Sequence, residues 1–149
     1  MSHVGAGYVV YINAKEEITG SIKLSQNATV FQAEIIAIKE AVKTYIQEKK
    51  DEYQFIKIIT DSQAAFHALA STTYTSKVVK ETILELNKLG EMVTRVEVTW
   101  IKAHAGHKGN ERADELARQA NDIEDIDFHI ADSWTEYKSK LLSSIVAPI

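Results

Sequence analysis

Cysteine is absent from this sequence of 149 residues, which excludes disulfides, thiolate zinc sites and cysteine nucleophiles. Any metal ion must therefore be held by oxygen or imidazole ligands. The sequence also lacks an apolar run long enough to cross a membrane, and its start lacks the basic-then-apolar pattern of a secretory signal. We therefore expect an intracellular protein with no membrane partner.

An excess of basic residues is lacking as well. The sequence has 17 lysines and arginines against 21 aspartates and glutamates, a net charge of −4. This balance argues weakly against a protein that coats nucleic acid, because such proteins displace counterions with a basic surface. It does not exclude a nuclease, because a nuclease site concentrates carboxylates around divalent cations.

Internal repeats and low-complexity segments are also missing, and the length fits one domain with a substantial core. We expect this domain over residues 1–122. Residues 123–149 are predicted to be an acidic linker followed by a helical tail, because Ser133 and Glu136 have the spacing of a capping box.

The N-terminal part has the composition of a β-hairpin. Residues 4–12 and 18–24 are rich in β-branched and aromatic residues, and the polar residues 13–17 between them predict a five-residue turn. Gly5 and Gly7 are interpreted as loosening the start of the first strand.

The longest predicted helix follows this hairpin. Thr29 and Gln32 form a capping-box pattern at its start. Lys39 is expected on its solvent side, whereas Glu34 falls on the edge of the buried stripe, where a carboxylate needs a partner. The stripe follows helical spacing and consists of Phe31, Ile35, Ile38, Val42, Tyr45 and Ile46.

The second half alternates strands and helices. Residues 55–60 predict a short strand that ends at Asp61, and residues 64–69 predict a helix directly after it. A further amphipathic helix is expected to stop at Gly90, and residues 95–101 alternate as a half-buried strand does. The predicted fold class is α/β with a mixed sheet.

The stretch from Trp100 to Ala117 joins a strand end, a polar loop and a helix start. Asp114 lies one turn into this predicted helix, on the border of its apolar face. His104 stands at the strand exit, where a group that titrates near neutrality can move protons. The spacing of His104 and His107 is a poor zinc signal without cysteine, and His107 is interpreted as an exposed loop residue.

Three carboxylates, Glu34, Asp61 and Asp114, fall at a strand end or early in a helix. Each one alone is typical of a helix cap or of a partner for the helix dipole. Together they favour Mg²⁺ or Mn²⁺, which prefer oxygen ligands and take part in in-line phosphoryl displacement.

Three segments carry a resemblance to a known family. Residues 101–117, with the sequence IKAHAGHKGNERADELA, resemble the C-terminal motif of type 1 ribonuclease H, and residues 60–63 (TDSQ) resemble its middle motif. Residues 31–34 (FQAE) and the helix after them are similar to the helix motif of ribonuclease H domains in non-LTR retrotransposon polyproteins. The motifs occur in the family's order and spacing.

The resemblance implies a ribonuclease H-like mixed sheet flanked by helices. It also implies a nuclease that uses two divalent metal ions to cut the RNA strand of an RNA–DNA hybrid. By motif match, Glu34, Asp61 and Asp114 would bind Mg²⁺ or Mn²⁺, and His104 would assist product departure.

Gln32, Ser62 and Asn110 match family positions near the substrate strands. A protein can distinguish the RNA strand through its 2′-hydroxyl groups, which a hybrid of A-like form displays in a wide, shallow minor groove. A reverse transcriptase, joined to this chain in a larger polyprotein, is a further implied partner.

Two departures from the family pattern alter these expectations. The family has a basic substrate-binding protrusion where residues 72–90 are short and mildly charged, so we expect weaker binding. The family's first and central strand, which carries a catalytic aspartate, would precede Val4, and the first aspartate here is Asp51. A gap between two strand edges is expected, which residues 143–149, a partner chain or direct pairing of the flanking strands could fill.

The leading hypothesis is a ribonuclease H-type domain whose activity is in question because one ligand is missing. The alternative is a non-catalytic ribonuclease H-like module that binds nucleic acid or protein partners. A third hypothesis, an unrelated α/β domain whose acidic residues are all caps, ranks last.

Overall fold

The computed structural model describes residues 4–12, 14–49, 55–71 and 76–127. The order of strands and helices agrees with the sequence prediction through the fourth helix, and the predicted helix from Ser133 lies outside the described residues. The elements are β1 (Val4–Ile12), β2 (Lys15–Leu24), α1 (Val30–Lys49), β3 (Phe55–Thr60), α2 (Gln63–Ala70), α3 (Lys77–Met92), β4 (Arg95–Trp100), α4 (Lys108–Gln119) and the 3₁₀ turn η1 (Ala120–Asp122).

Strands β1 and β2 form the expected antiparallel hairpin, but the predicted five-residue turn is wrong. Strand β2 begins at Lys15, so only positions 13 and 14 separate the strands. Ala14 adopts a left-handed φ of 62°, and the register shifts between Val10 and Tyr11. The polar residues after the turn therefore belong to an exposed strand end.

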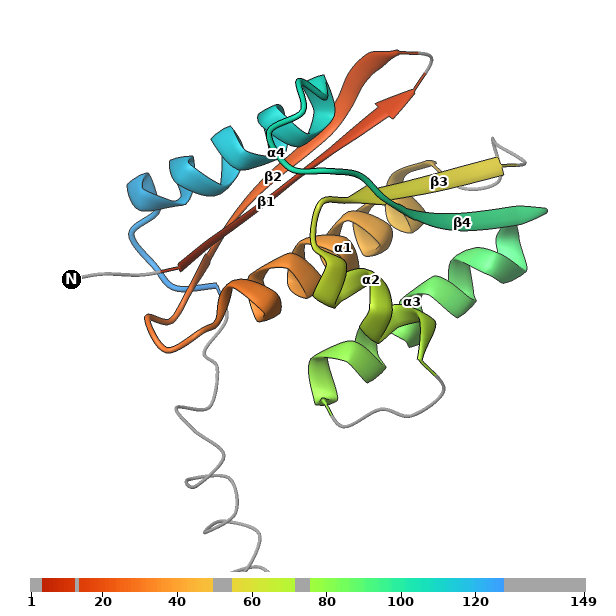
Figure 1. The fold of residues 1–149 in the computed structure, drawn as a ribbon, viewed down its shortest axis with the longest axis horizontal. Coiled ribbons are helices and arrows are strands. Elements are labelled where there is room, and N and C mark those ends of the chain that lie inside the picture. Colours follow the sequence, from red (N-terminus) through yellow and green to blue (C-terminus); the bar gives the residue numbers. More distant parts are fainter. Residues whose placement is uncertain (1–3, 13, 50–54, 72–75, 128–149) are drawn as a thin grey trace, which may run out of the picture.

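Strands β3 and β4 form a second pair, which is parallel and runs in register from Phe55 opposite Arg95 to Thr60 opposite Trp100. The four described strands thus make two separate two-stranded sheets. In Figure 1, β1 and β3 run in opposite directions. The α/β class with flanking helices is confirmed, and the parallel and antiparallel pairs are not joined into one sheet.

Helix α1 begins with the predicted capping box. The Thr29 amide donates to Gln32 Oε1 at 2.8 Å, and the Gln32 amide donates to Thr29 Oγ1 at 3.0 Å. The helix packs on β1 and β2 with one face and on α2 and α3 with another. It is therefore the element that both sheets share.

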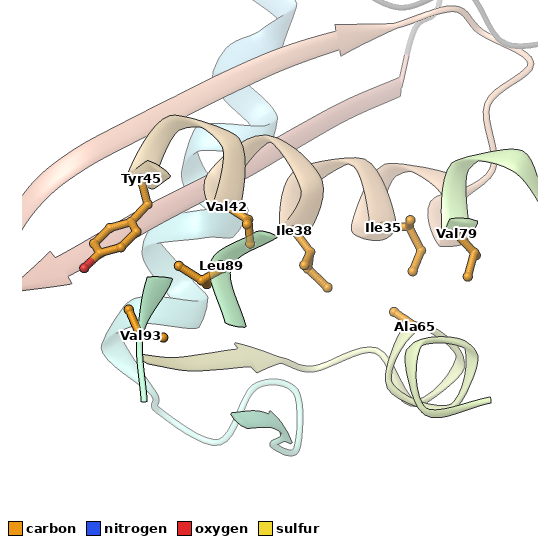
Figure 2. Packing of buried hydrophobic residues seen from close by; sticks show 8 residues of the cluster. All are labelled: Ile35, Ile38, Val42, Tyr45, Ala65, Val79, Leu89 and Val93. Carbon is orange, nitrogen blue, oxygen red and sulfur yellow. The ribbon is translucent and has the colours of Figure 1, made fainter. Parts of the chain in front are cut away.

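The second face of α1 supplies half of the buried residues of the larger core. In Figure 2 four of its side chains lie toward residues of α2 and α3 and toward Val93, which follows α3. A smaller cluster beneath the hairpin includes Ala6, Leu24 and Ile36. Lys39 was predicted to face solvent but is buried, with its Nζ 3.3 Å from Glu81 Oε2 on α3, because α3 packs beside this part of α1.

Helix α3 does not stop at Gly90 as predicted but continues to Met92. A Cβ added to Gly90 would meet no atom within 4 Å, so this glycine lies on an open side of the helix. The buried residues Leu89 and Val93 anchor the end of the helix, and the Val93 amide donates to the Leu89 carbonyl at 3.1 Å. Packing of these residues therefore outweighs the stop signal that a glycine gives.

Helix α4 lies so close to β1 that the facing positions of the strand, Gly5 and Gly7, have no room for side chains. A Cβ on Gly5 would fall 2.1 Å from the Ala117 carbonyl oxygen, and one on Gly7 would fall 2.3 Å from the Ala113 carbonyl oxygen. Gly5 and Gly7 therefore do not loosen the strand. They allow its backbone to approach α4.

Further hydrogen bonds attach α4 and the residues after it to the hairpin. Arg112 donates from Nε and Nη2 to the Glu16 carboxylate at 3.1 to 3.3 Å. The backbone of Lys23 at the end of β2 bonds to Asp127 through both its amide and its carbonyl. None of the helices in the described ranges has the length and apolarity needed to cross a membrane.

We predict opposite effects for alanine at two glycines. Gly7→Ala should destabilise the fold by about 2 kcal/mol or more, because the new methyl group would overlap the backbone of α4. Gly90→Ala, the matched control, should stabilise it by up to about 1 kcal/mol, because alanine is the better helix residue and the site is open. Urea unfolding of both variants checks this, and equal stabilities would contradict the close approach of α4 to β1.

Candidate metal centre

Three elements carry the three carboxylates singled out in the sequence. Glu34 lies on α1, Asp61 follows the last residue of β3, and Asp114 lies on α4. Helix α4 begins at Lys108, earlier than predicted, so Asp114 lies in its second turn. Because β1 touches both α1 and α4, it brings Glu34 and Asp114 to one place.

A cavity of about 40 Å³ lies between these helices at the glycine-rich part of β1. Its volume is enough for a water molecule or a small cation. Glu34, Asp114 and the amide side chain of Asn110 are its polar lining. The other lining residues are small, namely Gly5, Ala6, Gly7, Ala33, Ala37, Ala113 and Ala117.

The electrostatics show that the carboxylates interact. Burial, and after it the negative charges of Asp61 and Asp114, raise the pKa of Glu34 from 4.5 to about 7. The pKa of Asp114 is also raised, first by burial and then by Asp61, while His104 and Arg118 act against this rise. Glu34 therefore lies in a crowded anionic environment that a cation would relieve.

Asp61 is held from two sides. Asn110 Nδ2 donates to Asp61 Oδ2 at 3.1 Å, and Trp100 Nε1 donates to the Asp61 carbonyl oxygen at 3.1 Å. Just before Asp61, the Ile101 amide donates to the Thr60 carbonyl at 2.9 Å, which extends the pairing of β3 and β4. Strand pairing and these two side chains thus fix where β3 presents its carboxylate.

Ser62 and Gln32, matched to substrate positions, also have local structural tasks. The Ala65 amide donates to Ser62 Oγ at 3.0 Å, which makes Ser62 the N-cap of α2. Gln32 completes the capping box of α1 through its side-chain oxygen. Both side chains stay partly exposed. The capping contact of Gln32 uses its side-chain oxygen and not its side-chain nitrogen, Nε2.

The two histidines of the loop between β4 and α4 differ in conformation and in their effect on Asp114. His104 is exposed and has a left-handed φ of 56°, an unusual conformation for a residue with a side chain. Its charge is close enough to lower the pKa of Asp114 against the effect of burial. His107 is exposed at the start of α4, and its side chain makes no capping bond, as its loop interpretation predicted.

The donor set fits a hard divalent cation, because Glu34, Asp61 and Asp114 supply oxygen and interact electrostatically. Within the described ranges, however, no three acidic or histidine side chains stand close enough together to hold a metal ion as they are. Glu34, Asp61 and Asp114 nevertheless come from three separate elements and interact electrostatically.

Sequence reasoning missed two features of this site. One is the pairing of Gly5 and Gly7 with Ala113 and Ala117, whose matched small-residue spacing was a usable signal. The other is the bond from Trp100 to Asp61, for which the sequence has no local signal. Trp100, the last residue of β4, is 38% exposed.

Comparisons with known proteins show the family and the fold of this chain. The family model described as RNase H matches residues 1–122. The chain is 28% identical to a ribonuclease H of Tropheryma whipplei (strain Twist), across 91% of this chain and 88% of that one. It is 32% identical to a ribonuclease H of Pseudomonas fluorescens, across 72% and 73%. The structure of RNase H1 from the halophilic archaeon Halobacterium salinarum NRC-1 covers 80% of this chain and 86% of its own, with a TM-score of 0.62 and 23% identity, which shows the fold.

We predict that Glu34 makes the metal-free protein less stable as pH rises. The folded chain keeps a proton on Glu34 between pH 4.5, its ordinary pKa, and about 7, so stability falls across this window as the unfolded state releases the proton. Glu34→Gln should remove this loss and gain at most about 3 kcal/mol over the wild type above pH 7.

Urea unfolding in EDTA at pH 5 and pH 8 measures this difference. Glu91→Gln, at an exposed position on α3, is the control and should follow the wild type at both pH values. A Glu34→Gln variant whose advantage is the same at pH 5 and pH 8 would contradict the raised pKa.

Proposed function

Because this chain belongs to the ribonuclease H family, we propose that it hydrolyses the RNA strand of RNA–DNA hybrids with two divalent cations. Glu34, Asp61 and Asp114 would hold Mg²⁺ or Mn²⁺. The observation that carries this proposal is that Asp61 and Asp114, from two other elements, act on Glu34 and add to the effect of burial, which together raise its pKa to about 7.

When bound, the cations activate a water nucleophile and stabilise charge on the phosphate. The side chains of this chain would do the rest. Asn110 orients Asp61 by donating a hydrogen bond to the Asp61 carboxylate. His104 lies on an exposed loop, close enough to Asp114 to affect its pKa. The imidazolium of His104 would give its proton to the leaving ribose oxygen as the phosphorus–oxygen bond breaks.

The hybrid would lie across the open side of the centre. Lys102 and Lys108 are exposed on either side of His104, where phosphate contacts would give affinity that falls with salt. The partly exposed side chains of Gln32, Ser62 and Asn110 are proposed to contact the strands. Recognition of 2′-hydroxyls in the minor groove would select the RNA strand.

A non-catalytic ribonuclease H-like module is the second candidate. Two observations favour it: the four described strands stay in two unjoined pairs, and the carboxylates of the described residues do not form a ready-made metal site. Such a module would bind hybrids or protein partners through the same surface without metal and without cleavage.

We also propose, from the motif at residues 31–34, that the chain acts beside a reverse transcriptase within a larger polyprotein. The likeness of this motif to retrotransposon domains is the support. The relatives reported above are bacterial and archaeal proteins named as ribonuclease H. Copurification of a polymerase with the native protein would test this arrangement.

We predict metal-dependent cleavage of the RNA strand. A labelled RNA–DNA hybrid should be cut in Mg²⁺ or Mn²⁺ and left intact in EDTA, and Asp61→Asn should reduce the rate at least a hundredfold, because it removes a carboxylate ligand. Gel analysis of the labelled RNA measures the rate. Equal cleavage by wild type and Asp61→Asn would identify a contaminating nuclease.

A second prediction separates the two candidates. A β-strand with an Asp-Gly-Ser sequence, fused ahead of residue 1, should raise cleavage, because it can pair with a free strand edge and add a carboxylate. The same fusion with Asn-Gly-Ser is the matched control. Hybrid binding without metal, combined with no cleavage by either fusion, would establish the non-catalytic module instead.

A further inference from the structure

Trp100 occupies the last position of β4, beside the metal centre. It lies opposite Thr60, the last residue of β3, in the parallel pair. The residue is 38% exposed, so burial alone does not explain a large aromatic side chain here. The indole nitrogen reaches over the strand end and donates to the Asp61 carbonyl oxygen at 3.1 Å.

This bond restrains the main chain of Asp61. An indole has a single donor and no acceptor, so its partner fixes the orientation of the ring. The Ser62 amide donates to Thr60 Oγ1 at 3.1 Å on the other side of the same segment. The peptide units around Asp61 are thus held by two bonds that do not involve its carboxylate.

The place of Asp61 matters to the other two carboxylates. Its charge raises the pKa values of both Glu34 and Asp114. Asn110 also holds Asp61, but it does so through Oδ2, an atom that a cation would compete for. The bond from Trp100 leaves both carboxylate oxygens available.

We infer that Trp100 is a positioning residue that holds Asp61 in place for the divalent cation through its indole N–H. This inference rests on the proposed metal-dependent function. Partners outside the ligand set typically change metal affinity by about 10-fold to 100-fold when they are removed. Losing the indole N–H should lower metal affinity by about 10-fold, the smaller of these values, because the bond acts on the main chain of Asp61 and not on its carboxylate.

The exposed ring suggests a competing role as a stacking surface for a base or sugar of the hybrid. The two roles use different parts of the side chain. Trp100→Phe keeps an aromatic face and loses the N–H, whereas Trp100→Leu loses both. Positioning therefore predicts that both variants bind the cation more weakly, and stacking predicts that only Trp100→Leu weakens hybrid binding.

Mn²⁺ binding to the full chain, measured by electron paramagnetic resonance of the free ion, is the direct test. Trp100→Phe should bind Mn²⁺ roughly tenfold more weakly than wild type. The amount of Mn²⁺ that gives half-maximal cleavage should rise by a similar factor, while KM for the hybrid at saturating Mn²⁺ stays unchanged. Trp134→Phe, which alters the only other tryptophan, is the matched control.

Three results would overturn the inference. The first is that Trp100→Phe binds Mn²⁺ as tightly as the wild type does. The second is a raised KM for the hybrid with unchanged Mn²⁺ affinity, and the third is a lowered melting temperature with no change in Mn²⁺ affinity or KM. Asp61→Asn in the same assay distinguishes this failure from failure of the proposed function. If Asp61→Asn loses Mn²⁺ binding and Trp100→Phe does not, only the role of Trp100 is wrong; if neither loses it, the proposed metal site is wrong.

Discussion

The contact between α4 and β1 is the constraint on which the site depends. The helix can lie against the strand because Gly5 and Gly7 have no side chains and Ala113 and Ala117 have small ones. This contact sets the position of Asp114 and Asn110 relative to the hairpin. The ion pair of Arg112 with Glu16 strengthens the attachment only at the surface, where such pairs contribute about 1 kcal/mol or less.

The candidate metal centre lies where two halves of the molecule meet. One half consists of β1, β2, α4 and η1, the other of α2, α3, β3 and β4, and α1 packs against both. Asp114 belongs to the first half, Asp61 to the second and Glu34 to the shared helix. The bond from Asn110 to Asp61 crosses between the halves. The spacing of the carboxylates is therefore a property of how both halves rest on α1.

The parts of this arrangement that sequence reasoning found are those with local causes. The capping box of Thr29 and Gln32 and the placement of Asp61 after a strand depend on neighbouring residues. The parts that it missed depend on partners far along the chain. Lys39 is buried only because α3 supplies Glu81, and α3 passes Gly90 because Leu89 and Val93 are buried. The domain boundary at residue 122 stays a prediction, although Asp127 still contacts β2.

Two strand pairs that share no ladder also have a consequence for how the protein opens. Proteins unfold locally in cooperative units that follow their supersecondary structure. The hairpin joins strands that follow each other directly in the sequence. Two helices lie between β3 and β4 in the sequence, so the entropic cost of bringing these two strands together is larger. Amide hydrogens of β3 and β4 can therefore exchange with solvent while those of β1 and β2 stay protected. Each such opening would separate Asp61 from Asp114 without unfolding the chain.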